Sequence, residues 1–400
     1  MSEIDKLIAR FCPEGVEYKE LGVVTKILNG FAFKSSRYRE SGIRVVRISD
    51  VQKGRMSDKD LKFYPLESEQ EIKNYLLHKD DLVMSLTGNV GRVAMLREED
   101  LPAALNQRVA CLRPKGEILT RYLFHFLDRD EFENEAMNNA KGGGQKNMST
   151  AWLSKIKIPI PPLEVQRAIV GVLDSFTELE AELEAELEAR KKQYEFYRNQ
   201  LLILKNIEGV EYKKIKDVYK RLRGTPITAG KMREIQVPNG EVRVFAGGKT
   251  VIDANEQDIP KANITKVPAV LVQSRGVIDA IFYDKPFTFK NEMWAYTSDN
   301  MTSVKFLYYM LKNNIDYFRD AASGMGSLPQ ISLRVTENFT MPIPPAKEQR
   351  CIVSILDKFD KLTTDISVGL PAEINARRKQ YEYYRSKLLT FDEKKEPAHV

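Results

Sequence analysis

The chain contains few cysteine and histidine residues, which limits both covalent cross-linking and metal chemistry. Its 400 residues include three Cys (Cys12, Cys111 and Cys351) and three His (His78, His125 and His399). No two Cys form a CxxC pair. An odd number of scattered Cys is typical of a reducing compartment and does not indicate a disulfide framework. A zinc site needs clustered Cys and His ligands, so we expect no metal site. The pattern predicts a cytoplasmic protein.

Long apolar runs are also missing. No uninterrupted apolar stretch approaches the roughly 20 residues that cross a bilayer. The first residues, MSEIDKLIARF, carry acids and lack the apolar core of a signal peptide, so export is not expected. Apolar residues nevertheless make up 42% of the chain. That composition can bury the cores of about two to three domains.

Motifs for catalysis are missing as well. The tetrapeptide GGKT at 247–250 resembles part of a P-loop, but the first glycine of that motif would stand at Arg243, so a polar loop is expected. No NPPY-like tetrapeptide or cofactor glycine loop of a DNA adenine methyltransferase is present. Asp58, Glu71 and Lys73 have a nuclease-like order, yet such triplets are common where 30% of residues are charged. We expect no catalytic residues.

What the chain has is a long internal repeat. Residues 159–179 recur as 342–362 with 12 of 21 positions identical, and residues 189–202 recur as 376–389 with 10 of 14 identical. Near the start of each half, residues 15–30 recur as 209–224 with 9 of 16 identical. A spacing this long excludes a solenoid, whose repeats run to about 20–50 residues, and indicates a duplicated domain arrangement.

Between the repeated segments, each half alternates short β-like runs with turns and then becomes helical. The β-like runs are IRVVRI, DLVMSL, GRVAML and RVACLR in the first half, and EVRVFA, AVLVQS, VIDAIFY and MWAYTS in the second. Helical stretches follow at 120–140 and 304–322. The expected fold class is therefore α+β, with two globular mixed α/β domains.

The expected boundaries follow the repeat. Residues 2–11 form a helix in which Ser2 and Asp5 are placed as a capping box. The parts are a helical segment 1–14, a first globular domain 15–158, a first long helix 159–206, a second globular domain 207–341, a second long helix 342–390 and a polar tail 391–400.

The two repeated segments read as long helices that need a partner. Pro161–Pro162 and Pro344–Pro345 suit a first helical turn, and apolar residues then recur at helical spacing, with Pro371 interrupting the second copy. Residues 163–205 have nine acids and six bases, and residues 346–389 have six acids and nine bases. The opposite charges make the copies plausible mates, and we expect an antiparallel coiled coil with pseudo-two-fold duplication.

Three copies of one quadruplet, ELEA, occupy residues 178–189 of the first helix. The two helix copies differ in length by four residues here, since their offset is 183 before this run and 187 after it. Four residues add ~6 Å and roughly 40° beyond a full turn. One DNA base pair is ~3.4 Å and about 35°, so a quadruplet matches one pair by rotation and nearly two by length.

The net charge of +6 lies outside the two helices, because their charges cancel. A basic surplus favours a nucleic-acid partner, although ordinary solubility charge would also account for it. Arg, Lys, Asn and Gln in glycine-containing loops are the residue types that contact phosphates and base edges. The candidate DNA-binding residues are Lys34, Arg37, Arg47, Arg92, Gln107, Arg108, Lys146, Asn147, Arg221, Arg223, Lys249, Gln273, Arg275, Asn291 and Gln330.

Two divergent globular domains, each followed by a PIPP-x3-QR-x-IV-x2-LD-x-F helix that ends in R-(R/K)-K-Q-Y-E-x-Y-R, resemble the specificity subunits of type I restriction–modification systems. The resemblance covers essentially the whole chain. It implies that the globular parts are target recognition domains, each of which reads half of a split, asymmetric DNA sequence. The helices are then an antiparallel spacer.

The resemblance also implies partners. Two methyltransferase (modification) subunits dock on the chain, and restriction subunits complete the nuclease; S-adenosylmethionine, ATP and Mg²⁺ bind to those subunits and not to this chain. We assign Gln166, Arg167, Gln349 and Arg350 in the helix signatures to partner binding. The residues alone leave two alternatives open, a coiled-coil scaffold without a DNA function and a self-sufficient DNA enzyme.

Overall fold

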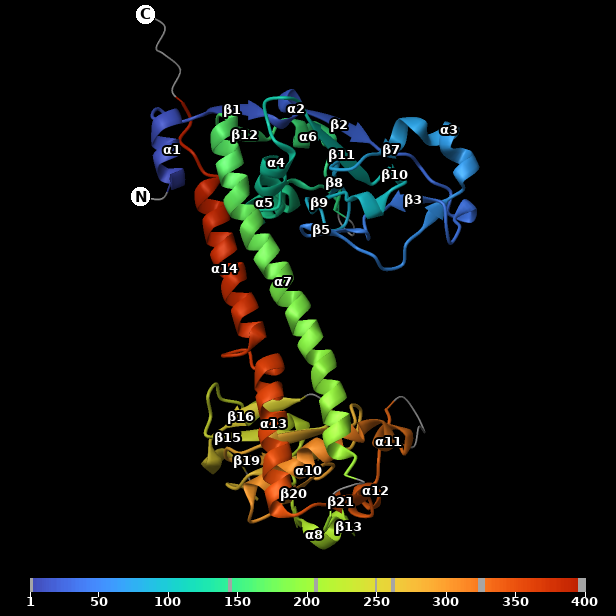
Figure 1. Cartoon of the computed structure of the whole chain (residues 1–400), viewed down its shortest axis with the longest axis vertical. Helices are drawn as coiled ribbons and strands as arrows, with labels where there is room; N and C mark the ends of the chain where they lie inside the picture. Colours follow the sequence, from blue (N-terminus) through green and yellow to red (C-terminus); the bar gives the residue numbers. More distant parts are fainter. Residues whose placement is uncertain are drawn as a thin grey trace, which may run out of the picture. The chain divides into compact units, whose positions relative to one another are not determined.

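The computed structural model describes residues 3–142, 146–204, 208–248, 250–259, 263–322 and 328–394, so the expected cap at Ser2 lies outside it. The chain divides into two compact units: unit 1 is Met1–Leu183 with Ile374–Val400, and unit 2 is Glu184–Glu373. Helix α7 (Leu163–Leu202) begins in unit 1 and ends in unit 2 (Figure 1). The division between the units falls inside the ELEA run.

In its described residues, unit 1 contains two four-stranded sheets and two smaller strand pairs. One four-stranded sheet has the order β2 (Thr25–Asn29), β11 (Val109–Pro114), β8 (Leu82–Ser85), β9 (Val93–Met95). The other has the order β6 (Phe63–Tyr64), β3 (Ile43–Val46), β10 (Ala103–Leu105), β7 (Leu76–Leu77). The pairs are β1 (Glu17–Glu20) with β12 (Lys157–Ile160), and β4 (Val51–Gln52) with β5 (Arg55–Met56).

Helices cover one face of the first of these sheets. Side chains alternate along β8: Leu82 and Met84 join a core with α4 (Thr120–Leu127) and α7, while Val83 joins a core with the second sheet. Both faces of the strand are therefore buried, which explains its continuous apolar sequence. Besides the C-terminal helix described below, the other helices of unit 1 in the described residues are α1 (Glu3–Phe11), α2 (Leu21–Val24), α3 (Glu69–Ile72), α5 (Asp130–Asn139) and α6 (Thr150–Ser154).

Unit 2 is built from the same kinds of sheet. One has the order β14 (Lys220–Leu222), β20 (Trp294–Thr297), β17 (Ala269–Gln273), β18 (Asp279–Tyr283), and another the order β16 (Val251–Ala254), β15 (Val242–Phe245), β19 (Phe287–Phe289). Strand β13 (Glu211–Lys214) pairs with β21 (Thr340–Ile343) as β1 pairs with β12. The expected β-runs of both halves are confirmed.

The sheet packing of unit 1 also recurs in unit 2. Val270 and Val272 of β17 join the core of α10 (Met301–Asn313), and Leu271 joins Phe287 and Phe289 of the other sheet. Further helices of unit 2 are α8 (Ile215–Val218), α9 (Ala229–Ile235), α11 (Ile315–Asp320), α12 (Leu333–Glu337) and α13 (Ala346–Thr364). No helix in the described ranges is long and apolar enough to cross a membrane.

The second repeated segment is two helices, α13 and α14 (Leu370–Leu388), separated by non-helical residues 365–369. Pro371 was expected to interrupt a helix, but it stands in the first turn of α14, where a missing N–H is tolerated. The chain breaks before it, at Gly369, where a Cβ atom would lie 2.5 Å from the Lys361 carbonyl oxygen. This break accommodates the four extra residues of the second copy.

Each unit holds its part of α7 against a helix of the second segment by the same aromatic contacts. In unit 1, the ring centre of Phe176 on α7 lies 5.4 Å from the ring centre of Tyr384 and 6.5 Å from that of Tyr381, both on α14. In unit 2 the roles are exchanged: Phe359 of α13 lies 6.0 Å from Tyr194 and 5.7 Å from Tyr197, both on α7. Stacked rings of this kind add about 0.5–1.5 kcal/mol to the burial of the helices.

Candidate nucleic-acid interface

Three loops of unit 1 meet at the ends of strands β8 and β10. The Leu86 N–H donates to the Arg108 carbonyl (2.9 Å), and the Met148 N–H donates to the Leu86 carbonyl (2.8 Å). The Gly88 N–H donates to the Lys146 carbonyl (3.1 Å). These bonds join the loop after β8, the turn after β10 and the loop after α5. They bring four of the predicted residues to one place: Gln107, Arg108, Lys146 and Asn147.

Unit 2 joins the corresponding loops by bonds of the same kind. The Ile331 N–H donates to the Ser274 carbonyl (2.9 Å), and the Gly276 N–H donates to the Pro329 carbonyl (2.9 Å). The Ser274 hydroxyl donates to the Glu292 carbonyl. Three further predicted residues are brought together by these bonds: Arg275, Asn291 and Gln330.

The two loop sets correspond residue by residue. An antiparallel bridge joins Thr87 to Asn147 in unit 1 and Arg275 to Gln330 in unit 2. The next residue in each case is a glycine in the left-handed region, Gly88 with φ 76° and Gly276 with φ 80°. Glycine adopts this conformation without the steric cost that a Cβ atom brings. The same backbone turn is therefore built twice.

A second close approach fixes the turn after β10 and its counterpart after β19. A Cβ atom on Gly30 would lie 2.4 Å from the Leu105 carbonyl oxygen, and one on Gly224 would lie 2.4 Å from the Phe289 carbonyl oxygen. Each turn closes with a backbone hydrogen bond of 2.9 Å. The Val109 N–H donates to the Asn106 carbonyl, and the Met293 N–H donates to the Lys290 carbonyl. Gln107 thus corresponds to Asn291, and Arg108 corresponds to Glu292.

Two neighbouring clefts lie beside the loops of unit 2. A cleft of about 590 Å³ is lined by polar side chains from four segments, among them Arg221, Arg223, Asn263, Asn291 and Gln330. A cleft of about 720 Å³ is lined by Arg275, Lys290 and Glu292 among others, so Glu292 borders both. The Glu292 carboxylate accepts from the Gly247 N–H (3.3 Å) and pairs with Lys290 (3.1 Å).

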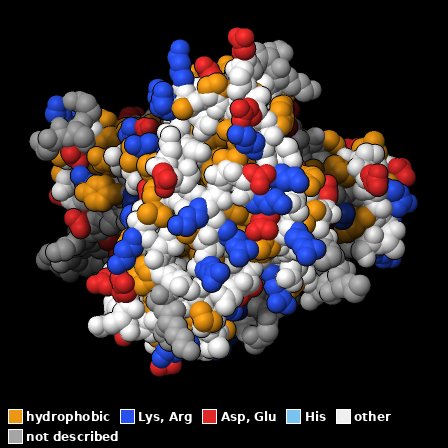
Figure 2. Space-filling model, turned by 90° about the horizontal axis from the view of Figure 1, so that it is seen from below, with side chains coloured by type: hydrophobic (Ala, Val, Ile, Leu, Met, Phe, Trp, Pro, Cys, Tyr) orange, Lys and Arg blue, Asp and Glu red, His pale blue; other side chains and the backbone are white. Residues whose placement is uncertain are grey.

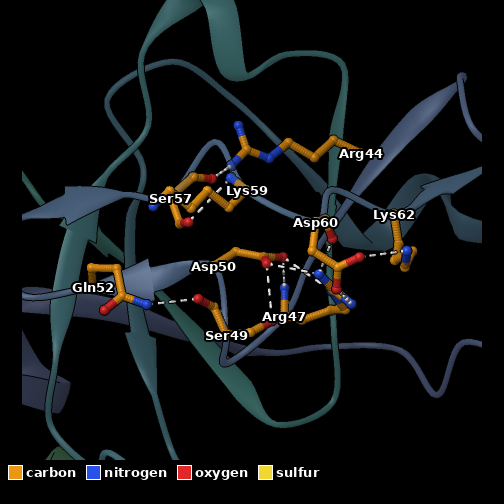
Figure 3. A network of polar contacts seen from close by, with 9 residues as sticks. All are labelled: Arg44, Arg47, Ser49, Asp50, Gln52, Ser57, Lys59, Asp60 and Lys62. Carbon is orange, nitrogen blue, oxygen red and sulfur yellow. Dashed lines mark hydrogen bonds and ion pairs between the residues drawn. The ribbon is translucent and has the colours of Figure 1, made fainter. Parts of the chain in front are cut away.

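Several predicted arginines are held by acids of their own unit. Figure 3 shows the Arg47 guanidinium between Asp50 and Asp60, and Arg47 keeps 19% of its side chain exposed. Arg37 pairs with Glu71 (3.0 Å) and lies over the Tyr64 ring, and Arg92 pairs with Glu133 (3.3 Å). In unit 2, Arg221 pairs with Glu337 (3.3 Å). These side chains have a partner within their own unit, whereas Lys34 and Arg223 are exposed and have no ion-pair partner in the described part of the chain.

Gln273 is a correction to the predicted set. It was expected to contact DNA, but only 5% of it is exposed, and its amide donates to the Gly248 carbonyl (2.6 Å). Gln273 therefore supports the GGKT loop from inside. That loop leads into strand β16 and not into a helix, so it lacks the helix N-terminus that holds phosphate in a P-loop. Lys249 lies outside the described residues.

The two glutamines assigned to partner binding are also corrected. Gln166 is fully buried, and its amide donates to the carbonyls of Pro161 (2.8 Å) and Glu117 (3.0 Å). Gln349 keeps 8% exposure and donates to the Pro344 carbonyl (2.9 Å). Both side chains fix the start of their own helix. Arg167 and Arg350 are exposed.

A basic surface marks one end of unit 2. Lys213, Lys214, Lys216 and Lys220 are exposed on β13, α8 and β14. Figure 2, which looks at the end of the molecule where β13 and α8 lie in Figure 1, shows Lys and Arg side chains gathered in the middle of that face. Residues 15–30 of unit 1 have two bases and two acids, while the matching residues 209–224 have six bases and two acids.

Groups for chemistry do not assemble. Among the residues that the structure describes, no group of three or more His, Cys, Asp or Glu is placed to hold a metal ion. The nuclease-like acids pair with arginines, Asp58 with Arg97 (3.5 Å) and Glu71 with Arg37.

The residues of these loops and clefts that sequence reasoning missed are Thr87, Asn263, Lys290, Glu292 and Trp294. A glycine three residues after the end of the corresponding strand, in SLTG and QSRG, was the available signal for aligning these loops.

Comparison with known proteins identifies the family of both halves. The model of the type I restriction modification DNA specificity domain matches residues 13–189 and 207–376. The specificity subunit of a type I restriction enzyme of Escherichia coli is 34% identical over 299 residues, covering 69% of this chain and 72% of that protein. A putative type I specificity subunit of Haemophilus influenzae is 32% identical, covering 72% of this chain and 76% of that protein.

A solved structure shares the fold. The crystal structure of a type I restriction–modification S subunit from M. genitalium superposes with a TM-score of 0.60 over 94% of this chain and 96% of that one, at 16% sequence identity. A structure from work on complex assembly and conformational transition of the type I system gives a TM-score of 0.57 at 16% identity, over 94% of this chain and 98% of that one.

Proposed function

The chain belongs to the family of type I restriction modification DNA specificity domains, and from this membership we propose that each of its units reads one half of a bipartite, asymmetric DNA target. It is a DNA specificity subunit of a type I restriction–modification system, and the chemistry of such a system resides on other chains.

The paired loops carry the proposal. Both units use one backbone frame, closed by matching hydrogen bonds and by Gly88 and Gly276, while the exposed side chains on that frame differ. A shared frame with different side chains suits two readers that approach DNA in the same way and recognise different bases. Contacts to phosphates position such a reader, and contacts to base edges specify the sequence.

Helix α7 and the α13–α14 segment serve as an antiparallel spacer in this proposal. In unit 1, Glu180 of α7 pairs with Arg378 of α14, close to the Phe176–Tyr381 contact, so residue numbers rise along one helix as they fall along the other. In unit 2, Phe359 of α13 contacts Tyr194 and Tyr197 of α7, and Figure 1 shows these two helices running in opposite directions there. Pseudo-two-fold pairing of this kind fixes how far apart the two readers act.

Two methyltransferase subunits are the proposed partners, one for each half-site, with restriction subunits added to complete the nuclease. Arg167 and Arg350 occupy equivalent exposed places on the two helices and are the remaining candidates for that docking. S-adenosylmethionine, ATP and Mg²⁺ belong to those subunits in the proposal. The complex would work in the cytoplasm, where chromosomal DNA is found.

Mapping methylated adenines tests the proposal. The chain is expressed together with its methyltransferase subunit, and modified positions are located across a host genome by single-molecule sequencing. We expect two short specified blocks separated by a fixed unspecified spacer, and no methylation from the methyltransferase subunit alone. Methylation without a shared sequence context, or at one continuous motif, contradicts the proposal.

Deleting one quadruplet, residues 182–185, tests the spacer. The deletion removes ~6 Å and one turn plus roughly 40° from α7. We expect the unspecified spacer of the DNA target to shorten by about one base pair, or by about two, while both half-sites keep their sequences. Inserting a fourth quadruplet should lengthen the spacer by the same amount, and Glu182→Gln, which keeps the length, should leave it unchanged. A changed half-site or an unchanged spacer contradicts the ruler.

A further inference from the structure

Two exposed arginines in the paired loops, Arg108 and Arg275, differ from Arg47 and Arg92. The guanidinium groups of Arg47 and Arg92 are paired with carboxylates of unit 1. The side chains of Arg108 and Arg275 are exposed and form no hydrogen bond or ion pair with the described part of the chain. Each of them therefore presents five N–H donors to a ligand from a loop whose backbone is fixed on both sides.

The neighbours of these arginines are the same in both units. Gln107 and Asn291 occupy one corresponding place, Asn147 and Gln330 the other, and all four carboxamides are exposed. Asn and Gln side chains pair with adenine through its N6 and N7 atoms. The two units thus carry exposed carboxamides at two matching places, and in unit 1 the Asn147 Oδ1 also accepts from the Thr87 hydroxyl (2.6 Å).

The arginine stands on a different loop in each unit. In unit 1 it is Arg108, on the turn after β10, where unit 2 has Glu292. In unit 2 it is Arg275, on the loop after β17, where unit 1 has Thr87. The Glu292 carboxylate pairs with Lys290 and accepts from the Gly247 N–H at that place, and a carboxylate offers no donor to the O6 and N7 acceptors of guanine.

We propose that Arg108 and Arg275 are the guanine-reading residues of the two half-sites. Because they stand on different loops, they place the guanine at different positions relative to the carboxamide contacts, and this displacement makes the two half-sites unlike each other. Each guanidinium donates two hydrogen bonds, to O6 and N7 of one guanine in the major groove. The inference rests on the proposed function, since it needs each unit to read one half-site.

Substitution of each arginine tests the inference in the full complex. Arg108→Ala and Arg275→Ala are each expressed with the methyltransferase subunit, and methylated adenines are mapped. We expect each variant to lose its preference for guanine at one position of its own half-site, with discrimination falling by about tenfold to 100-fold. The other half-site and the spacer should stay unchanged. Lys155→Ala and Lys285→Ala, exposed on the same units outside these loops, should leave the motif as it is.

Conservative variants separate base reading from charge. Arg108→Lys and Arg275→Lys keep the positive charge but lose the planar fork that contacts O6 and N7 together, so they should relax the same position as the alanine variants. Retained guanine at every position overturns the inference. A uniform loss of methylation with both substitutions, or a lowered melting temperature, also overturns it, because the arginine then serves affinity or folding. A wild-type complex that methylates no bipartite motif removes the proposed function itself.

Discussion

Units 1 and 2 differ least where their helices pack and most where their loops are exposed. Phe176 and its tyrosine partners in unit 1 are matched by Phe359 and its tyrosine partners in unit 2. Asp174 and Asp357 likewise occupy one position and accept bonds from helices α4 and α10. At the loops, in contrast, the corresponding residues differ although the backbone turn is the same. Arg108 of unit 1 corresponds to Glu292 of unit 2, and Thr87 corresponds to Arg275.

This contrast separates two kinds of constraint. A buried aromatic contact or a buried glutamine has few alternatives that fill its space and satisfy its bonds. An exposed side chain on a fixed loop can change its chemistry while the turn below it stays closed. The two units therefore show which residues the frame needs, and the remaining residues are free to define what each unit binds.

The largest effect is expected from the buried leucines at one corresponding position, Leu173 and Leu356. Both are fully buried, in the cores of unit 1 and unit 2 respectively. Truncation to alanine should cost about 3 kcal/mol of unfolding free energy in each unit. Hydrogen exchange of the full chain, resolved by peptide in denaturant, measures each unit separately.

The comparison predicts that each leucine variant weakens its own unit and leaves the other unit unchanged. Leu187→Ala is the matched control, because Leu187 lies on the same helix and is only half-buried, so its loss should be about 1 kcal/mol. Equal loss of protection in both units from Leu173→Ala would show that the units unfold together.

A smaller and unequal effect is expected at the two buried glutamines. The Gln166 side chain makes three hydrogen bonds, since its oxygen also accepts from the Leu119 N–H (2.9 Å). Within the described part of the chain, the Gln349 side chain makes one, to the Pro344 carbonyl. Unpaired buried polar groups cost about 1–3 kcal/mol each. Gln166→Ala should therefore destabilise unit 1 by about 3 kcal/mol or less, and Gln349→Ala should destabilise unit 2 by about 1 kcal/mol.

Melting curves and hydrogen exchange of the glutamine variants measure this difference. Arg167→Ala and Arg350→Ala, at the exposed neighbours, should change stability by less than about 0.5 kcal/mol. If the arginine variants fail to assemble with the methyltransferase subunit while the glutamine variants still assemble, the docking assignment to Arg167 and Arg350 gains support. Equal stability losses at the two glutamines would contradict the asymmetry of their bonds.

The sequence predicted the strands and helices because hydrophobic periodicity records which faces are buried. It also predicted the duplication, because identical residues mark it. It predicted an interruption at Pro371 but not that the non-helical residues come before this proline, since a proline in the first turn of a new helix and one that ends a helix look alike in sequence. Nor could it show that Gln166 turns inward, because a polar residue beside an exposed Arg167 carries no signal of burial.

The candidate interface was predicted in its composition and only partly in its members. Arg47 and Arg92 have the right chemistry in the right kind of loop, but acids distant in sequence, such as Asp60 and Glu133, pair with them. Glu292 was missed because an acid does not suggest DNA binding until its counterpart Arg108 is known. That correspondence depends on hydrogen bonds between loops, which the sequence does not display.

The smallest predicted effect concerns pH and a position where the units differ inside the frame. The Nε2–H of His125 in unit 1 donates to the Asp174 carboxylate (2.7 Å), its Nδ1 accepts from the Tyr381 hydroxyl (2.9 Å), and the side chain is fully buried. Burial lowers the pKa of His125 below its usual 6.5, although the Asp174 carboxylate opposes the shift. In unit 2 Tyr309 bonds Asp357 instead (2.6 Å).

The sign of the effect follows from which state binds the proton. As the pH falls below about 6.5, His125 becomes protonated in the unfolded chain before it does in the folded one, so unit 1 loses stability, by at most about 1.4 kcal/mol per pH unit. Asp128 has the opposite effect on stability, because burial raises its pKa to about 6. The folded state takes up this proton before the unfolded state does, so unit 1 gains stability from Asp128 as the pH falls. Hydrogen exchange between pH 7 and pH 5 should show the net change in unit 1.

His125→Tyr isolates the histidine, because it gives unit 1 the phenol that unit 2 already has and leaves Asp128 in place. The variant should retain a bond to Asp174 and become more resistant to acid than the parent between pH 6.5 and pH 5, by about 1 kcal/mol or less. The reciprocal change, Tyr309→His, should give unit 2 an acid sensitivity that it lacks, because the core around Tyr309 raises the pKa of that phenol and keeps it neutral over this range. Identical pH profiles for the parent and both variants would mean that the histidine and the tyrosine are interchangeable parts of one frame.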